Sequence, residues 1–475
     1  MKKGLEYIGV VERVEFPNKG TVRITKQCLP GGESVEVGEE DAGIRVQVKG
    51  VIEGQTVRFR VIRSHLSKRR AEGMLLSVES PSWLECESGC PQSKDCGGCF
   101  YQTLSYENQL AIKESLVHKL MDEVISEPYE FLPILGSPNT KAYRNKMEYS
   151  FGDEYKGGPL SLGLHKRGSF YDVLTTDRCV IVHEDYNRIV RAVLSEAQKT
   201  GLRHFHKITH LGYFRHLVVR RAQKTGEILV HIVTSSQSEG KEEAFLQNLV
   251  EKLCALSLDG TLCGIVHSRN DNLSDAVESD ETRVIYGRGF FYEEILGLRF
   301  RITPFSFFQT NSLGAELLYK TARDFIGNTK DKRVFDLYSG TGTIAQVLAP
   351  VARHVIGVEI VAEAVEAARE NAKDNGLDNC EFIAGDVLKM LDTIAERPDL
   401  IMLDPPREGI APKALEKIIA YGVERLVYIS CKPTSLQNDL RTLLANGYRV
   451  EKIQTVDMFP GTIHCETVCL LSRKA

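Results

Sequence analysis

Short runs of alternating apolar and polar residues fill the first 80 positions of the chain. Examples are YIGVVERVEF, GTVRITK and QTVRFRVIRS, and glycine or proline separates neighbouring runs. Because successive strand residues point to opposite faces, this alternation predicts several short, half-buried strands. We therefore expect a small all-β barrel over residues 1–80. Some barrels of this size bind nucleic acid and others are only structural, so the pattern leaves the role open.

Residues 81–295 mix helical and strand patterns. Ile112, Leu116, Leu120 and Val124 recur every four positions, which predicts one amphipathic helix. Strand-like runs such as KMEYSFG, HLVVRRA and EILVHIV follow. The segment is therefore expected to form an α+β middle domain.

From about residue 296 the pattern becomes regular. Continuous apolar runs such as RVFDLYS, HVIGVEI, PDLIMLD and RLVYIS alternate with amphipathic stretches. That alternation is typical of β-α-β units around a parallel sheet that is buried on both faces. The last two runs, YRVEKIQTVDM and CETVCLLS, have no helix between them and predict an antiparallel hairpin. The pattern predicts a multidomain α/β protein in which residues 296–475 form a Rossmann-like domain.

The overall composition fits a folded protein of several domains. A chain of 475 residues exceeds what one hydrophobic core supports, and we expect domains at 1–80, 81–295 and 296–475. No apolar run is long enough for a signal peptide or a membrane span, so a cytoplasmic protein without a membrane partner is expected. In a reducing cytosol its 12 cysteines are metal ligands or catalysts more often than disulfides.

The net charge of −4 gives no global sign of a nucleic-acid partner, so the charge pattern matters only locally. Residues 58–70 contain six Lys or Arg and no acid. Residues 199–224 contain seven Lys or Arg, four His, three aromatic residues and again no acid. Either segment alone could be a solvated surface, but two such segments in a slightly acidic chain favour a phosphate-facing surface.

Candidate ligand-binding residues follow three successive strands of the predicted sheet. In an open α/β sheet, ligands bind outside the carboxyl ends of the strands. A glycine turn, Asp336-Leu-Tyr-Ser-Gly340-Thr-Gly342, follows the first strand and allows close approach of a ligand. Glu359 ends the second strand, where a carboxylate can accept both ribose hydroxyls, and Asp386 follows the third at the height of an adenine ring. NAD would also fit these features.

Asp404 favours a different cofactor. It begins Asp404-Pro405-Pro406-Arg407, directly after the next strand. A carboxylate held by two rigid prolines suits a cationic cofactor or a polar target better than the pyrophosphate of a hydride carrier. In the alternative interpretation, Asp404 only caps the following helix.

Cys431 and Glu466 are the candidate catalytic residues. Cys431 follows the fifth strand in Ser430-Cys431-Lys432-Pro433, beside a lysine and close to a helix start, where a thiolate is favoured. If the last strand runs antiparallel, Glu466 begins it at the same sheet edge and faces Cys431. The alternatives are a buried structural cysteine and an exposed residue at a strand end.

Five motifs occur in one order along the chain: FFQTN at 307–311, the glycine turn at 336–342, DPPR at 404–407, SCKP at 430–433 and HCET at 464–467. Together they resemble the bacterial RNA uracil-5 methyltransferases, especially the 23S ribosomal RNA enzymes. The resemblance spans nearly the whole chain, because those enzymes also carry an N-terminal TRAM barrel, an OB-like RNA-binding module, and a four-cysteine cluster.

The resemblance implies roles for individual residues. Gln309, Tyr338, Glu359 and Asp404 would contact S-adenosylmethionine, beside the Gly340 turn and Asp386. Cys431 would add to carbon 6 of a uracil, which makes carbon 5 nucleophilic enough to accept a methyl group. Glu466 would then remove the carbon 5 proton so that the thiolate can leave.

Two positions depart from the family pattern. The family usually has Asn after the nucleophile, where this chain has Lys432. It usually has Arg before the Asp of the next helix, where this chain has Asn438 before Asp439. Neither residue touches the reacting atoms in that scheme, so the departures concern substrate choice more than chemistry.

Four cysteines lie within fourteen residues, at positions 86, 90, 96 and 99. Their spacing fits a tetrahedral zinc site or an iron-sulfur cluster, and physics alone does not separate the two. The resemblance implies a 4Fe-4S cluster held by Cys90, Cys96, Cys99 and the distant Cys179, with Cys86 as a spare. Zinc is the alternative metal.

The sequence therefore predicts an enzyme that methylates carbon 5 of a uridine in RNA. By resemblance the partner is 23S ribosomal RNA, and a uridine of transfer RNA is the alternative. A nitrogen-directed methyltransferase would have no use for Cys431. A non-catalytic RNA-binding protein is a further alternative, and the intact set of residues at the sheet edge argues against it.

Overall fold

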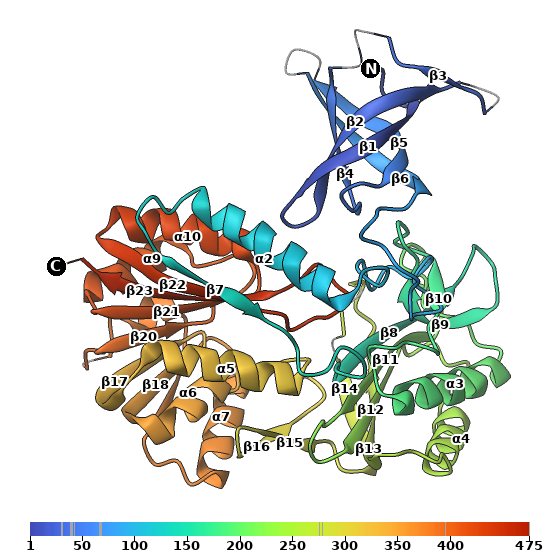
Figure 1. Cartoon of the computed structure of the whole chain (residues 1–475). Helices are drawn as coiled ribbons and strands as arrows, with labels where there is room; N and C mark the ends of the chain where they lie inside the picture. The colour runs from blue at the N-terminus through green and yellow to red at the C-terminus, as the bar shows by residue number, and fades with distance from the viewer. Residues whose placement is uncertain are drawn as a thin grey trace. The chain divides into compact units, whose positions relative to one another are not determined.

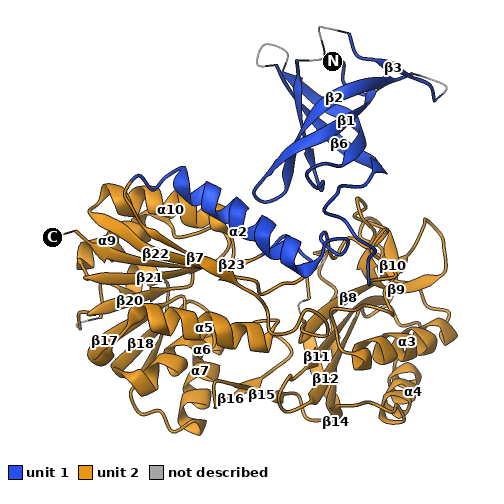
Figure 2. Ribbon diagram, viewed as in Figure 1, with its two compact units in different colours: residues 1–89, 100–126, 461–464 blue, residues 90–99, 127–460, 465–475 orange. Residues whose placement is uncertain are grey.

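The computed structural model describes residues 1–29, 32–38, 41, 43–65, 69–274, 276–277, 279–394 and 396–474. Within the predicted barrel, residues 30, 31, 39, 40, 42 and 66–68 lie outside the described residues, and the last three belong to the basic segment 58–70. The chain forms two compact units (Figure 2). The first unit is Met1–Gly89, Phe100–Ser126 and Gly461–His464, and the second is Cys90–Cys99, Glu127–Pro460 and Cys465–Ala475.

The first unit is built around a closed sheet of short strands. Its strands are β1 (Glu6–Glu15), β2 (Lys19–Cys28), β3 (Ser34–Glu36), β4 (Arg45–Lys49), β5 (Thr56–His65) and β6 (Arg70–Ser80). The order is β1-β5-β6-β4-β2-β3, and β1 also pairs with β2, which closes the sheet on itself. Alternate residues, such as Tyr7, Val22, Val46 and Phe59, are buried inside it. The alternation predicted from the sequence is therefore present in the strands.

Helix α2 (Tyr106–Asp122) also belongs to the first unit. Ser105 caps its N-terminus by accepting a hydrogen bond from the Asn108 amide. The predicted helix is confirmed, but it ends before Val124. Its buried residues include Gln109, whose side-chain amide donates to the carbonyl oxygens of Tyr101 and Leu104.

The second unit contains a seven-stranded mixed sheet. Its strands are β8 (Lys146–Asp153), β9 (Leu160–His165), β10 (Val173–Thr175), β11 (Phe214–Arg221), β12 (Glu227–Thr234), β13 (Thr261–Arg269) and β14 (Glu281–Gly287). The order is β10-β9-β8-β11-β12-β13-β14. Helices α3 (Glu184–Lys199) and α4 (Glu242–Cys254) pack on one face of this sheet, as Figure 1 shows.

An eight-stranded sheet follows in the same unit. Seven of its strands are β17 (Thr329–Leu337), β18 (Ala352–Glu359), β19 (Cys380–Ala384), β20 (Leu400–Leu403), β21 (Arg425–Ser430), β22 (Tyr448–Val456) and β23 (Glu466–Arg473). The helices before and between them are α5 (Ser312–Ile326), α6 (Thr343–Leu348), α7 (Ala362–Asp374), α8 (Val387–Met390), α9 (Pro412–Tyr421) and α10 (Pro433–Ala445). A hairpin of β15 (Phe291–Ile295) and β16 (Leu298–Ile302) precedes them. The order is β19-β18-β17-β20-β21-β23-β22-β7.

The predicted hairpin is confirmed, because β22 and β23 pair antiparallel. One strand of this sheet was not foreseen. β7 (Glu130–Leu135) pairs parallel to β22 as the eighth strand, although its sequence lies in the range predicted as the middle domain. The division into residues 1–80, 81–295 and 296–475 stays a prediction.

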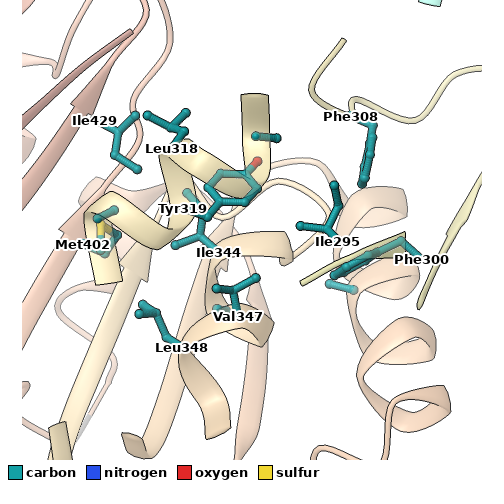
Figure 3. Packing of buried hydrophobic residues seen from close by; sticks show 14 of the residues in the cluster. Ile295, Phe300, Phe308, Leu318, Tyr319, Ile344, Val347, Leu348, Met402 and Ile429 are labelled. Atoms are coloured by element: carbon teal, nitrogen blue, oxygen red, sulfur yellow. The ribbon is translucent and has the colours of Figure 1, made fainter. Parts of the chain in front are cut away.

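Helices cover both faces of the eight-stranded sheet. Helices α5, α6 and α7 pack on one face and α9 and α10 on the other (Figure 1). Figure 3 shows the core under α5 and α6, where Leu318 and Ile344 meet the strand residues Met402 and Ile429. Among the described residues, no helix is long and apolar enough to cross a membrane.

Candidate active site

The carboxyl ends of five parallel strands meet at one edge of the eight-stranded sheet. Leu337, the last residue of β17, pairs with Val358 of β18 and with Leu403 of β20. Leu403 in turn pairs with Tyr428 of β21, and Glu359 of β18 pairs with the last residue of β19. The residues that end or follow these strands therefore gather at the same edge. They are Tyr338, Gly340, Glu359, Asp386, Asp404 and Cys431.

The last strand brings Glu466 to this edge. β23 runs antiparallel to β21, and Ser430 pairs with Thr467. Cys431 is the first residue after β21, and the residue before Thr467 is Glu466, with which β23 begins. The antiparallel register thus brings the candidate nucleophile and the candidate base to the same ends of two neighbouring strands. The Ser430 hydroxyl accepts a hydrogen bond from the Lys432 amide (3.2 Å), which holds the backbone around Cys431.

Three acidic groups lie at this edge, and each has a raised pKa. Burial raises the pKa of Asp404 to about 7. Burial and the charge of Asp404 raise the pKa of Glu466, which is 2% exposed, to about 8, while Arg407 opposes the shift. Burial, then Glu466 and Asp404, raise the pKa of the Cys431 thiol to about 12. A cation bound here would relieve this repulsion, so the donor set fits a sulfonium cofactor.

The charges that act on Cys431 differ from those that its sequence neighbours suggested. Its lysine neighbour and the helix start suggested a stabilised thiolate. Instead, burial and two nearby carboxylates favour the neutral thiol, and the positive charge that lowers its pKa belongs to Arg407. Sequence proximity did not reveal which charges face the sulfur atom.

The glycine turn has the geometry expected of a ligand-binding loop. Gly340 and Gly342 have φ angles of +54° and +71°, which favour glycine. A Cβ added at Gly340 would meet no atom within 4 Å, so the space over it is open. A Cβ at Gly342 would lie 2.5 Å from Phe382 Cε1, so Gly342 allows close packing behind the turn.

Backbone amides orient the carboxylate of Glu359. The Gly340 amide donates to Oε2 and the Val361 amide to Oε1, both at 3.0 Å. Each oxygen retains a further lone pair that can accept a ribose hydroxyl. Asp336 is different, because it is fully buried and accepts a hydrogen bond from the Ala345 amide (2.9 Å). Asp336 therefore orients the turn from the interior of the protein.

Tyr338 lies beside Asp386 at the same edge. Its φ angle is +69°, in the left-handed region that few non-glycine residues adopt. Burial, followed by the charges of Asp386 and Asp439, raises the pKa of Tyr338 to about 12. Asp439 accepts hydrogen bonds from the Ile410 amide (3.0 Å) and the Tyr428 hydroxyl (2.6 Å). Asp439 thus lies close to the site rather than remote from it.

Gln309 is held in place by two residues that sequence reasoning missed. Tyr319 of α5 is hydrogen-bonded to the Gln309 side chain and is 6% exposed. Burial, then the charges of Asp404 and Glu466, raise the pKa of Tyr319 well above its usual range. The Asn145 side-chain amide donates to the Gln309 carbonyl oxygen (2.9 Å).

The sequence signal for these two residues is weak. Tyr319 lies on the apolar stripe of α5, next to Leu318, and therefore resembles an ordinary core residue (Figure 3). Asn145 begins no recognisable motif, and its partner is 164 residues away along the chain.

The four cysteines for which metal binding was predicted act on one another electrostatically, and the metal site itself stays a prediction. Burial raises the pKa of Cys179 to about 12, and Cys99, Cys90 and Cys96 raise it further through their charges. The Arg167 guanidinium donates to the carbonyl oxygens of Ser93, Cys96 and Cys99. These hydrogen bonds stabilise the loop that carries Cys90, Cys96 and Cys99. A metal ion would relieve the repulsion between four thiolates, so the donor set fits a cluster or zinc. Cys86 belongs to the other unit.

Neither basic segment is free of acids in three dimensions. In the described part of 58–70, Arg58 and Arg60 both pair with Glu6 at 2.7 Å. In 199–224, Arg221 pairs with Asp185 at 3.0 Å. Buried Arg220 instead donates to backbone carbonyl oxygens. The sequence patterns therefore overstate the free positive charge.

Comparison with known proteins identifies the family of this chain. The family model described as tRNA (uracil-5-)-methyltransferase matches residues 105–474. An RNA methyltransferase of Clostridium tetani is 45% identical over 474 residues, covering 100% of this chain and 99% of the relative. One of Caldanaerobacter subterraneus is 49% identical over 431 residues, covering 91% and 94%.

A solved structure shows the same fold. It is that of Pyrococcus abyssi tRNA (uracil-54, C5)-methyltransferase in complex with S-adenosyl-L-homocysteine. The TM-score is 0.73 at 23% identity, with 98% of this chain and 100% of that chain covered. The likeness establishes a mixed α/β methyltransferase fold for this chain. By its family model and its relatives, the chain belongs to the RNA uracil-5-methyltransferase family, a family of S-adenosylmethionine-dependent RNA methyltransferases.

Proposed function

We propose that this enzyme methylates carbon 5 of a uridine in 23S ribosomal RNA through a covalent adduct between Cys431 and carbon 6. The observation that carries the proposal is the pairing of Ser430 with Thr467, which sets Cys431 against Glu466. The charge of Glu466 acts directly on the Cys431 thiol, which supports their proximity. A thiol and a carboxyl group at the same ends of two neighbouring strands suit an addition followed by a proton removal.

The two residues act in turn on the same ring. The Cys431 thiol first gives its proton to solvent, and its sulfur then adds to carbon 6, so a carbon–sulfur bond forms and the electron pair of the double bond moves onto carbon 5 and oxygen 4. S-adenosylmethionine, when bound, would supply the methyl group to which carbon 5 bonds, and the electrons of the broken sulfur–methyl bond would stay with the cofactor. Glu466 then takes the proton from carbon 5, and the electron pair re-forms the double bond as the sulfur leaves.

We further propose that Gln309, Tyr338, Gly340, Glu359, Asp386 and Asp404 hold the cofactor. The oriented Glu359 carboxylate and the open space over Gly340 support contacts with the nucleoside part. The partly exposed Asp404 carboxylate, whose pKa burial raises to about 7, supports a contact with the cationic part. A cation beside Asp404 also favours the thiolate of Cys431, because it offsets a charge that opposes ionisation.

The domain assignments remain part of the proposal. We propose residues 1–80 as a TRAM-like RNA-binding module, 81–295 as the iron-sulfur and α+β domain and 296–475 as the methyltransferase domain. Separate sheets over most of these ranges support the division, with β7 and the β15–β16 hairpin across residue 295 as exceptions.

Labelling of RNA tests the proposed substrate. The enzyme is incubated with labelled S-adenosylmethionine and total RNA from a strain that lacks the gene, and the labelled base is mapped. The expected result is label on carbon 5 of a uridine in 23S ribosomal RNA. Label in transfer RNA would favour that alternative, while label on a ring nitrogen would contradict the carbon 5 chemistry.

We also propose that Cys90, Cys96, Cys99 and Cys179 hold a 4Fe-4S cluster. After anaerobic purification we expect about four iron and four sulfide per chain. Cys179→Ser should lose most of the iron, because the charges of the other three cysteines act on the Cys179 thiol and it is one of the four proposed ligands. Cys86→Ser is the matched control and should retain it. Stoichiometric zinc without iron in the wild-type protein would contradict the cluster and favour a zinc site.

A further inference from the structure

Three loops of the second unit carry an unusual set of exposed aromatic side chains. The loops comprise residues 153–158, 165–172 and 203–212, and we call them together the aromatic loop surface. Phe170, Tyr171 and Tyr155 are 84%, 60% and 62% exposed. Ile208 and Leu211 are 64% and 65% exposed. Large side chains are not left in water to this extent for stability, so the surface is a candidate binding site.

Contacts between the loops make this surface continuous. The Lys166 ammonium pairs with Glu154 at 3.2 Å, which joins the first two loops. The Lys207 ammonium lies 3.4 Å from His165 Nε2 and 3.5 Å from the Phe170 carbonyl oxygen, which joins the second and third. The exposed rings and the cations of the third loop therefore belong to one surface.

Cations slightly outnumber acids on the surface. Its acidic residues are Asp153, Glu154 and Asp172, and its basic residues are Lys156, Lys166, Arg203 and Lys207, together with four histidines, while the Arg167 guanidinium is directed to backbone carbonyl oxygens. The acid-free sequence segment 199–224 contributes the third loop. Its other arginines are committed elsewhere: Arg215 and Arg220 donate to backbone carbonyl oxygens and Arg221 to Asp185. Lys199 and Lys224 pair with Glu196 and Glu316, so Arg203 and Lys207 are the cations that this segment contributes to the third loop.

Residues 90–99, which we call the cysteine loop, form hydrogen bonds with the middle loop of the aromatic loop surface. Arg167 turns away from solvent to the carbonyl oxygens of Ser93, Cys96 and Cys99. Its own amide donates to the Asp95 carbonyl oxygen (2.7 Å), and the Gly97 amide donates to the His165 carbonyl oxygen (3.0 Å). These contacts fix the start of the middle loop, and the Lys166 amide closes the loop by donating to the Asp172 carbonyl oxygen (3.0 Å). A fixed loop loses less entropy on binding.

We propose that the aromatic loop surface binds an unpaired segment of the substrate RNA, outside the nucleotide that is methylated. Bases stack on Phe170 and Tyr171, and the cations Arg203 and Lys207 neutralise phosphates. Exposed rings interspersed with cations suit single-stranded RNA, because every base has a π-face and every linkage carries a negative charge. The proposal rests on the RNA substrate of the proposed function. It assigns to the cysteine loop the task of holding an RNA-binding surface in place.

The test compares two variants of the full-length enzyme. Phe170→Ala combined with Tyr171→Ala removes both rings. Tyr286→Ala is the matched control, because Tyr286 is an exposed aromatic residue (40%) on β14, the opposite edge strand of the same sheet. The probe is a labelled oligouridine, and its dissociation constant is measured for each protein. Thermal melting checks that both variants are folded.

Loss of the two rings should weaken oligouridine binding by about tenfold or more, since each base–aromatic stack is worth roughly a factor of 5 to 150. Methylation of 23S ribosomal RNA should show a raised KM for RNA, while kcat and S-adenosylmethionine affinity stay unchanged. Arg203→Gln combined with Lys207→Gln should reduce the salt dependence of binding by about one phosphate contact or more. The Tyr286→Ala control should match the wild type.

The outcomes separate this proposal from the proposed function. Wild-type affinity and wild-type KM in the Phe170→Ala, Tyr171→Ala variant would overturn the proposal, and a protein partner would then be the better occupant. That result would leave 23S methylation by the wild type intact. If instead the wild type methylates no uridine, the proposed function fails, while the oligouridine measurement still decides whether this surface binds RNA.

Discussion

Replacing Cys431 with alanine is expected to abolish both methylated product and the covalent RNA adduct. Carbon 5 of uracil is a poor nucleophile until a sulfur atom adds to carbon 6. Cys431 supplies a thiol at the sheet edge where Asp404 and Glu466 also lie. Loss of a nucleophile of this kind typically lowers kcat by roughly four to six orders of magnitude. Product formation and a protein–RNA band under denaturing conditions are the two measurements.

Controls show whether this loss is chemical. Cys431 is partly exposed, so its removal should leave folding and S-adenosylmethionine binding, measured by calorimetry, nearly unchanged. Cys254→Ala is the matched control, because Cys254 is an exposed cysteine at the end of α4, outside the sheet edge. Full activity of Cys431→Ala would refute the adduct and favour a nitrogen-directed methyltransferase.

The sheet edge could be predicted because the glycine turn, DPPR and SCKP motifs each come at the end of a continuous apolar strand. In a parallel sheet the carboxyl ends of strands must meet, so Asp404 and Cys431 could be placed together without coordinates. Glu466 needed one further step, the antiparallel direction of β23, and the missing helix between the last two strands supplied it.

Other features could not be predicted, because they depend on contacts between distant segments. β7 looks like any short strand, and only its pairing with β22 assigns it to the eight-stranded sheet. The raised pKa of the Cys431 thiol depends on burial and on the charged groups close to it in space, not on its neighbours in sequence. The acid-free segment 58–70 gains Glu6 through the pairing of β1 and β5.

The pH dependence of turnover follows from Glu466. Only a carboxylate can accept the carbon 5 proton, and burial with the Asp404 charge raises the Glu466 pKa to about 8. A base with a raised pKa is protonated at lower pH, so product release should increase as pH rises through that pKa. Arg407 opposes the shift, and a bound cation beside Asp404 opposes it too, which moves the rise toward neutral pH.

Glu466→Gln is expected to trap the RNA adduct instead of turning over. Glutamine keeps the size of the side chain but cannot take the carbon 5 proton, so the methylated ring stays bonded to Cys431. Addition itself should survive, because the variant removes a negative charge that raises the Cys431 pKa. Turnover should fall by about two to four orders of magnitude, the usual contribution of a general base.

Mass spectrometry of the trapped species distinguishes this role from a purely structural one. The adduct of Glu466→Gln should carry one transferred methyl group, and it should persist at a pH where the wild-type enzyme has already released its product. Asp404→Asn is the informative comparison, since loss of the carboxylate proposed to face the sulfonium should remove cofactor binding and give no methylated adduct. Rapid release of product by Glu466→Gln would show that another group takes the proton. A collapse of Glu466→Gln to an unfolded protein would instead show that the buried carboxyl group is needed only for packing at the start of β23.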